Sequence, residues 1–261
     1  MALQPIKMPD TSRWSLPFSY HPVRLALVLV CGAVLAILTI QPAAGWYAHE
    51  RGQAEAQAGR QGLALDWFRL ASLIDPGTTG YHDAVARTSV QLFHQSGDPT
   101  WLVKAVEEEG QAVELNPMDG RFPYRLGTIY GVLAEQKLAK AQHDLLLSQA
   151  AQAYEQAIQA DPYSPLNYMA LANIRLSEGR VEEAKARLQQ AVVTEPNFLP
   201  ARTILAELSL KAGERKVTQS EFDAIVVIKR KYEGWVLNDT ERQFLDVDLS
   251  PLGRALALEP K

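Results

Sequence analysis

Acidic, histidine and cysteine side chains are the residues in this chain that could bind a metal, and their spacing argues against a site. Glu107–Glu109 form a run of carboxylates, but no aspartate-rich ligand loop surrounds it, so we expect a solvated patch near a helix start. No two of the five histidines fall three or four residues apart, which excludes a ligand pair on one helix. Cys31 is the one cysteine, so it forms no intrachain disulfide and no thiol cluster. The sequence predicts no metal and no cofactor.

The motifs that carry catalysis are missing from the sequence. There is no phosphate-binding glycine loop, no G-x-S-x-G nucleophile turn and no H-E-x-x-H zinc motif. The formal net charge of −4 gives the chain no bulk attraction for nucleic acid. Lys229–Lys231 is short, and we interpret it as a charge cluster at the C-terminal end of a helix. We therefore predict a non-enzymatic protein with no catalytic residues and no nucleic-acid partner.

An uncharged segment near the N-terminus is long enough to cross a membrane. Leu25–Ile40 contains sixteen residues without a charge, and the uncharged stretch continues for 24 residues in all. A membrane span needs about 20 apolar residues, and aromatic residues such as Trp46 and Tyr47 favour the membrane–water interface. The sequence predicts an N-terminal tail over 1–24 and a transmembrane anchor, or uncleaved signal, over 25–46.

The alternative for the same segment is a cleaved signal peptide. Ala43-Ala44-Gly45 has the small side chains of a cleavage site. The apolar region of a signal peptide is usually about 7–15 residues long, which is shorter than the segment seen here. Length therefore favours the anchor.

Positive charges indicate how the anchor is oriented. Lys7, Arg13 and Arg24 precede the segment, with Arg24 directly beside it, whereas Arg51 and Arg60 follow it. Positive residues close to a span favour the cytoplasmic side. We predict a single-pass protein of the inner (cytoplasmic) membrane, with its N-terminus in the cytoplasm and the remainder periplasmic or extracytoplasmic.

The second half of the chain repeats itself at an interval of 34 residues. The segment AYEQAIQADP, which ends at Pro162, is echoed by RLQQAVVTEP, which ends at Pro196. Between the two prolines, apolar residues recur three and four positions apart in two runs, which predicts two helices joined at Gly179. Small residues at the crossing, Ala172 and Ala184, would let the helices pack closely. The pattern resembles the tetratricopeptide repeat (TPR), a 34-residue helix–turn–helix unit. Its positions are held by Tyr168, Leu171, Ala172, Gly179, Ala184, Leu188, Ala191 and Pro196.

The same register extends through most of the chain. Pro76, Pro117 and Pro162 delimit two further units, of 41 and 45 residues. Their excess over 34 residues is close to two and three helical turns, so we favour lengthened hairpins that keep their faces in phase. A loop at 95–99, which is rich in turn residues, is the alternative for the 41-residue unit.

Both ends of the repeat region are irregular. In the first repeat Gly52 and Gly59 take the small-residue and turn positions, so this repeat starts almost at the membrane. In the last one Thr218 replaces the usual alanine, and the sequence TQSE that it opens is typical of a capping box before a helix. We predict an all-α fold: the membrane helix, a TPR-type superhelix over 47–230 with about four repeats and a degenerate fifth, and capping helices over 231–261.

The resemblance implies a concave face lined by the first helix of each hairpin, where such proteins usually hold a peptide or another protein. Met169 and Ile204 stand where chaperone-binding TPR clamps carry a lysine and an asparagine, so this chain lacks that clamp. An ordinary solvated face is the alternative for each lining residue. The predicted partner-binding residues are Asp83, Arg87, Gln91, Arg121, Tyr124, Thr128, Met169, Asn173, Ser177, Thr203, Glu207 and Lys211.

The order of short tail, single span and repeats is similar to that of bacterial inner-membrane assembly factors. The segments ELNPMDGRFPYRLGTIY and NDTERQFLDVDLSPL also resemble, loosely, the TPR regions of O-antigen ligase and polysaccharide polymerase proteins. The many-span catalytic part of those proteins is absent from this sequence. The resemblance implies a scaffold that binds and positions proteins, including an integral membrane protein, in an envelope complex for polysaccharide assembly or export.

The alternative function is a cleaved, soluble periplasmic module that binds a peptide or a glycan. A glycan would need aromatic platforms, and the candidates are Tyr124, Tyr154, Tyr163 and Tyr168. The repeat register assigns Tyr154 and Tyr168 to the core, which weakens this alternative.

Overall fold

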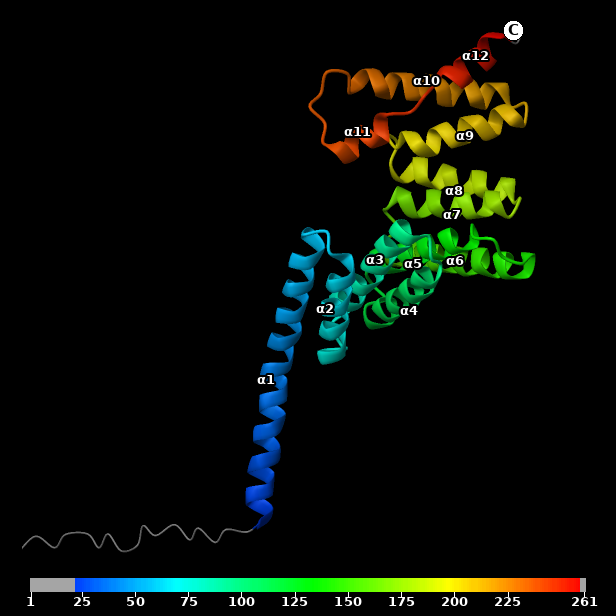
Figure 1. Ribbon diagram of the computed structural model, residues 1–261. Coiled ribbons are helices and arrows are strands. Elements are labelled where there is room, and N and C mark those ends of the chain that lie inside the picture. The colour runs from blue at the N-terminus through cyan, green and yellow to red at the C-terminus, as the bar shows by residue number, and fades with distance from the viewer. Residues whose placement is uncertain (1–21, 259–261) are drawn as a thin grey trace, which may run out of the picture.

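The computed structural model describes residues 22–258, and every regular element in that range is a helix. Five antiparallel hairpins, from α1·α2 to α9·α10, follow one another, and each packs on the next (Figure 1). The predicted all-α class is confirmed. The helices are α1 (Pro22–Gln57), α2 (Gln61–Ile74), α3 (Thr79–Ser96), α4 (Thr100–Leu115), α5 (Arg121–Ala134), α6 (Lys140–Ala160), α7 (Pro165–Ser177), α8 (Val181–Thr194), α9 (Leu199–Lys211), α10 (Arg215–Lys231), α11 (Asp239–Leu245) and α12 (Ser250–Leu258).

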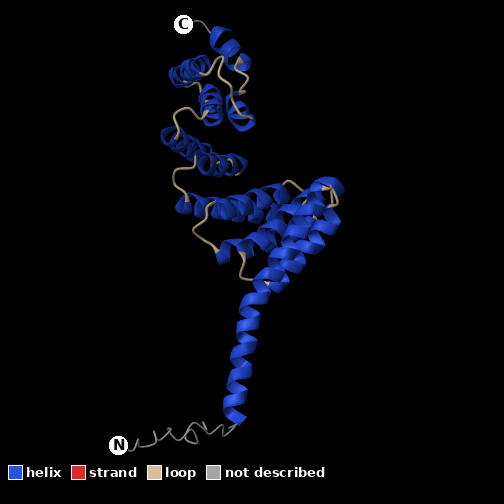
Figure 2. Cartoon of the chain, turned by 90° about the vertical axis from the view of Figure 1, so that its left-hand side faces the viewer, coloured by secondary structure: helices blue, strands red, loops and turns tan. Residues whose placement is uncertain are grey.

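Helix α1 joins the apolar segment to the first hairpin without a break (Figure 2). It is 36 residues long and carries Pro42 inside it. Within residues 22–258 it is the one helix that is long and apolar enough to cross a membrane, and none of its apolar window is buried. The predicted border between 46 and 47 falls inside this helix. Lys7 and Arg13, which carry part of the orientation argument, lie outside the described residues.

Small residues hold the two helices of a hairpin close together, as the repeat register predicts. Ala172 in α7 and Ala184 in α8 are fully buried in one apolar cluster. Gly52 in α1 faces Phe68 in α2 so closely that a Cβ atom at position 52 would lie 2.6 Å from the Phe68 ring. The turn at Gly179 has φ of 76°, a conformation that glycine adopts without strain.

The two long units are lengthened hairpins. Helix α3 has 18 residues and α4 has 16, whereas α7 and α8 of the 34-residue unit have 13 and 14. In the 45-residue unit the extra length lies mainly in α6, which has 21 residues. In the turn-rich segment at 95–99 the first two residues belong to α3, and only 97–99 form a short connection, in which Gly97 ends α3 with φ of 71°. The interpretation as lengthened hairpins is confirmed.

The fifth hairpin differs from the others at its crossing. Thr218 is fully buried there, at the position that alanine holds in the regular repeats. Its predicted role in a capping box is wrong, because α10 begins three residues earlier and the Thr218 hydroxyl donates to the Glu214 carbonyl oxygen within the helix, at 3.2 Å. Burial of a small side chain between α9 and α10 outweighs the capping tendency of the sequence TQSE.

The C-terminal segment covers the last hairpin. Leu249 and Val247 pack on the cluster formed by Leu199 and Ile225, and Leu252 of α12 is buried. The Lys229 ammonium at the end of α10 donates to the Val247 carbonyl oxygen at 2.8 Å. Lys229–Lys231 form the last turn of α10, as predicted. The apolar end of the stack is thereby shielded from solvent.

Candidate partner-binding groove

The predicted lining residues lie on the first helices of successive hairpins. They come from α3, α5, α7 and α9, and none of them is fully buried. Eight of the twelve are exposed, and Asp83, Tyr124, Met169 and Thr203 are partly buried. The hydroxyl groups of Thr128, Ser177 and Thr203 donate to carbonyl oxygens of their own helices. The Thr128 oxygen in turn accepts from the Tyr154 hydroxyl, whereas the Ser177 and Thr203 oxygens can accept a hydrogen bond from a partner.

Two of the three residues of this set on α3, Asp83 and Arg87, belong to a charged cluster that we call the Arg125 network. Arg125, in α5, pairs with Asp83 of α3 and with Glu109 of α4, where Nε and Oε1 lie 3.0 Å apart. Asp83 also pairs with Arg87 one turn further along α3, at 3.2 Å. One guanidinium therefore ties three helices of two adjacent hairpins together beside the predicted groove.

Glu109 is the buried member of the Arg125 network. Its side chain has no exposed surface, and its Oε2 atom has no hydrogen-bond partner among the described residues. Burial raises the pKa of Glu109 to about 7, although the Arg125 guanidinium opposes this shift. The predicted solvated patch near a helix start is therefore wrong for Glu108 and Glu109: the run lies in the middle of α4, and Glu108 pairs with His82 at 2.9 Å. Glu107 is exposed, as predicted.

A sequence signal for these carboxylates was present. Glu109 falls four positions after Ala105 and three before Ala112, and both alanines are fully buried. This spacing places Glu109 on the inner face of α4. Sequence reasoning missed Arg125 because its pairing depends on how α5 is placed against α3 and α4, which no local pattern specifies.

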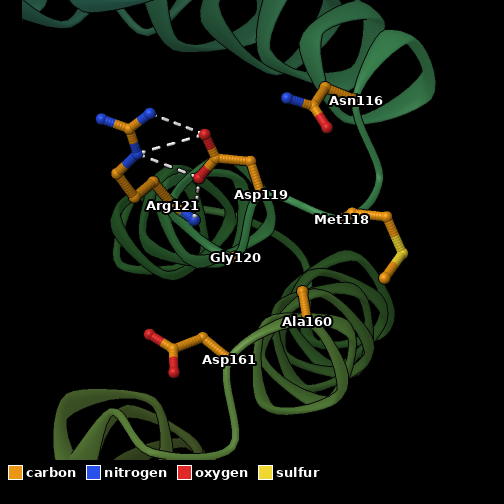
Figure 3. A pocket seen from close by; sticks show the side chains of 7 residues that line it. All are labelled: Asn116, Met118, Asp119, Gly120, Arg121, Ala160 and Asp161. Carbon is orange, nitrogen blue, oxygen red and sulfur yellow. Dashed lines mark hydrogen bonds and ion pairs between the residues drawn. The ribbon is translucent and has the colours of Figure 1, made fainter.

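Two hollows flank the N-terminal end of α5. The first has a volume of about 290 Å³ and is lined by Arg121, Tyr124 and Arg125 of α5, together with residues at the start of α7. The second, of about 480 Å³, lies between the α4–α5 loop and the end of α6 (Figure 3). Arg121 lines both. The full linings are Gly120, Arg121, Tyr124, Arg125, Asp161, Ser164, Leu166 and Asn167 for the first and Asn116, Met118, Asp119, Gly120, Arg121, Ala160 and Asp161 for the second.

Arg121 is held in place by Asp119. Its Nε and Nη2 atoms lie 2.9 Å and 2.6 Å from the two carboxylate oxygens, in the fork geometry drawn in Figure 3. Hydrogen bonds from Arg121 lower the pKa of Asp119. The guanidinium remains largely exposed, so it can take a second anionic partner while Asp119 fixes its position.

Tyrosines form the wall beside the first hollow. The Tyr124 and Tyr154 rings lie 5.6 Å apart between centroids, and the Tyr154 hydroxyl is 3.1 Å from the Thr128 hydroxyl. Burial raises the pKa of Tyr154 to about 12. Tyr154 belongs to the core, as predicted, and Tyr168 is half-buried with its hydroxyl bonded to the Pro162 carbonyl oxygen at 3.0 Å. Burial therefore leaves the Tyr154 ring no exposed face on which a sugar could stack.

The structure thus brings part of the predicted set together on α3 and α5, on the N-terminal half of the predicted groove. Asp83 and Arg87 join the Arg125 network, and Arg121 and Tyr124 line the first hollow. Gln91 and the residues on α7 and α9 line neither hollow. Among residues 22–258, no three His, Cys, Asp or Glu side chains gather closely enough to hold a metal ion.

Comparison with known proteins supports the repeat register. Residues 147–208 match the family model described as tetratricopeptide repeat. In sequence, the chain is 28% identical over 211 residues to cellulose synthase operon protein C of Pseudomonas fluorescens, which covers 71% of this chain. The chain spans only 16% of that relative's length.

Solved structures with the same architecture share little sequence with this chain. MamA from Desulfovibrio magneticus aligns over 73% of this chain and 98% of its own, with a TM-score of 0.58 and 14% identity. Pseudomonas aeruginosa PilF aligns over 83% of this chain and 91% of its own, with a TM-score of 0.53 and 20% identity. YrrB, described as a TPR protein with an unusual peptide-binding site, aligns over 71% of this chain and 86% of its own, with a TM-score of 0.52 and 13% identity. These matches confirm the predicted repeat fold.

Proposed function

We propose that this chain, a protein of tetratricopeptide repeats, is a membrane-anchored scaffold whose groove binds an extended segment of a partner protein. The fold typically serves protein interaction rather than catalysis. The proposed setting is a bacterial envelope complex for polysaccharide assembly or export, with the repeats on the periplasmic side. The proposed partner is an integral membrane protein, because the anchor keeps the groove close to the bilayer.

The observation that carries the proposal is the arrangement around Arg121. Its guanidinium is fixed by Asp119, remains exposed, and lies beside Tyr124 at a hollow of about 290 Å³. A partner carboxylate could pair with Arg121 while an apolar side chain of the partner rests on Tyr124. Binding by a few charged and aromatic residues of this kind is typical of peptide-binding surfaces.

The polysaccharide setting rests on relatives. Cellulose synthase operon protein C is similar over most of this chain, but the chain spans a small part of it. The loose resemblance of two segments to the TPR regions of polysaccharide polymerase proteins points in the same direction. The anchor rests on the length and exposure of the apolar part of α1 and on Arg24 at its start.

The test is purification of the tagged full-length chain from native membranes in mild detergent, with partners identified and quantified by mass spectrometry. The Arg121→Glu variant should lose the integral membrane partner that the unmodified chain retains. Lys216→Glu is the matched control, because Lys216 is an exposed cation on α10, a second helix of a hairpin.

Two outcomes would contradict the proposal. If Arg121→Glu and Lys216→Glu retain the same partners in the same amounts, the hollow at α5 is not the binding site. If the intact mass of the chain places its N-terminus near Gly45 and the protein is soluble, the cleaved periplasmic module is the better description.

A further inference from the structure

The C-terminal turn of α2 exposes large apolar side chains at the base of the first hairpin. Leu73 is 79% exposed and Leu70 is 42% exposed. On the adjacent part of α1, Trp46 and Tyr47 are also more than half exposed. A group of exposed apolar side chains of this size usually marks a surface that contacts a protein or a membrane.

Contacts between α1 and α2 fix the level of this turn along α1. The Gln41 side-chain amide donates to the Ile74 carbonyl oxygen at the end of α2. One to two turns higher, the Tyr47 and Trp67 rings meet edge to face, 6.4 Å apart between centroids. The last two turns of α2 therefore run beside residues 41–47 of α1.

The same residues of α1 are needed to complete a membrane span. Leu25–Ile40 is sixteen residues long, which gives about 24 Å of helix at about 1.5 Å per residue. The hydrocarbon core of a bilayer is about 30 Å thick, so a span that begins near Leu25 reaches its far boundary at about residue 44. That boundary lies at the level of the α2 C-terminal turn.

We infer that the C-terminal turn of α2 inserts into the polar–apolar boundary of the lipid bilayer, with Leu70 and Leu73 among the lipids. Trp46, Tyr47 and Trp67 then form an aromatic belt at that boundary. Arg69 is exposed on the same helix, at a position to meet lipid phosphates. The first repeat is thus partly a membrane-surface element, and the inference rests on the anchor in the proposed function.

The polar groups at this end of α2 are compatible with such a position. The Ile74 carbonyl oxygen accepts from Gln41, and the Asp75 backbone N–H donates to the Ala71 carbonyl oxygen. The Asp75 carboxylate accepts from the Thr78 hydroxyl at 2.7 Å. These backbone groups therefore remain hydrogen-bonded when water is scarce.

Site-directed spin labelling of the full chain tests the inference. Cys31 is replaced by alanine, and one cysteine is introduced as Leu73→Cys, Leu29→Cys in the span, or Val193→Cys on α8, which is 80% exposed. Each protein is reconstituted at low density in phosphatidylcholine–phosphatidylglycerol vesicles, and collision of the label with oxygen and with a water-soluble nickel chelate is measured.

The expected result is an oxygen-to-nickel ratio at Leu73→Cys that approaches the ratio at Leu29→Cys and exceeds that at Val193→Cys several-fold. If Leu29→Cys is lipid-exposed while Leu73→Cys matches Val193→Cys, the inference is overturned and the anchor stands. If all three match water, the anchor itself fails. A label at 73 that neither reagent reaches is covered by protein, which also overturns the inference.

Discussion

Substituting Gly52 by alanine tests the close contact between α1 and α2. A methyl group at this position would lie 2.6 Å from two ring carbon atoms of Phe68 and 3.1 Å from a third. Phe68 is buried with Ala64 and Val85, so its ring cannot turn aside freely. Such overpacking costs about 1–3 kcal/mol, against a gain of about 1 kcal/mol from replacing glycine in a helix.

Gly110→Ala is the matched control, because Gly110 is also helical and a Cβ atom there has no neighbour within 4 Å. This variant receives only the helix-propensity gain. The free energies of unfolding of the two variants should therefore differ by about 1–3 kcal/mol, with Gly52→Ala less stable. Urea denaturation of the full chain in detergent micelles, followed by circular dichroism, measures the difference.

A second substitution tests whether the loss of stability arises from contact with Phe68. Gly52→Ala should destabilise the chain less in a Phe68→Leu background than in the unmodified chain, because the smaller side chain leaves room for the methyl group. If Gly52→Ala is as stable as Gly110→Ala, α1 and α2 are not in close contact at Gly52 and Phe68.

Two further predictions concern buried side chains. Ala184→Leu should cost about 1–3 kcal/mol because Ala184 is fully buried against α7; an unchanged urea midpoint would contradict the repeat register. Glu109→Gln should flatten the pH dependence of stability. A carboxyl whose pKa is raised by folding from 4.5 to about 7 keeps its proton in the folded state and loses it in the unfolded state, so stability falls as the pH rises through this window. Relative to Glu109→Gln, the free energy of unfolding of the unmodified chain should fall by on the order of 2 kcal/mol between pH 5 and pH 8. Parallel pH profiles of the two proteins would show that Glu109 is not buried as a titrating acid.

Most of the helical architecture follows from local pattern. Pro76, Pro117, Pro162 and Pro196 each come one residue after the C-cap of a second helix, where a proline cannot continue the helix. Apolar residues three and four apart then fix which face of each helix is buried. The spacing of the prolines also indicated lengthened hairpins, although not which helix of the pair carries the extra turns.

The Arg125 network was harder to predict. Arg125 pairs with carboxylates on two other helices, and those pairings depend on the rotation between adjacent hairpins. That rotation arises from packing along the whole interface rather than from any short motif. Thr218 illustrates the opposite difficulty, because a valid local capping pattern was overruled by burial at a helix crossing.

The continuity of α1 has a mechanical consequence in the proposed anchored state. Its 36 residues form one helix of about 54 Å, which continues through Pro42 from the part in the bilayer to the part in the first repeat. A change in tilt of about 10° would therefore swing Gln57 sideways by about 9 Å relative to Pro22. Because α2 is bonded to the same helix at Gln41, the first repeat swings with it. Because a span that is longer than the bilayer is thick can tilt to fit, bilayer thickness would then influence how far the predicted groove leans over the membrane.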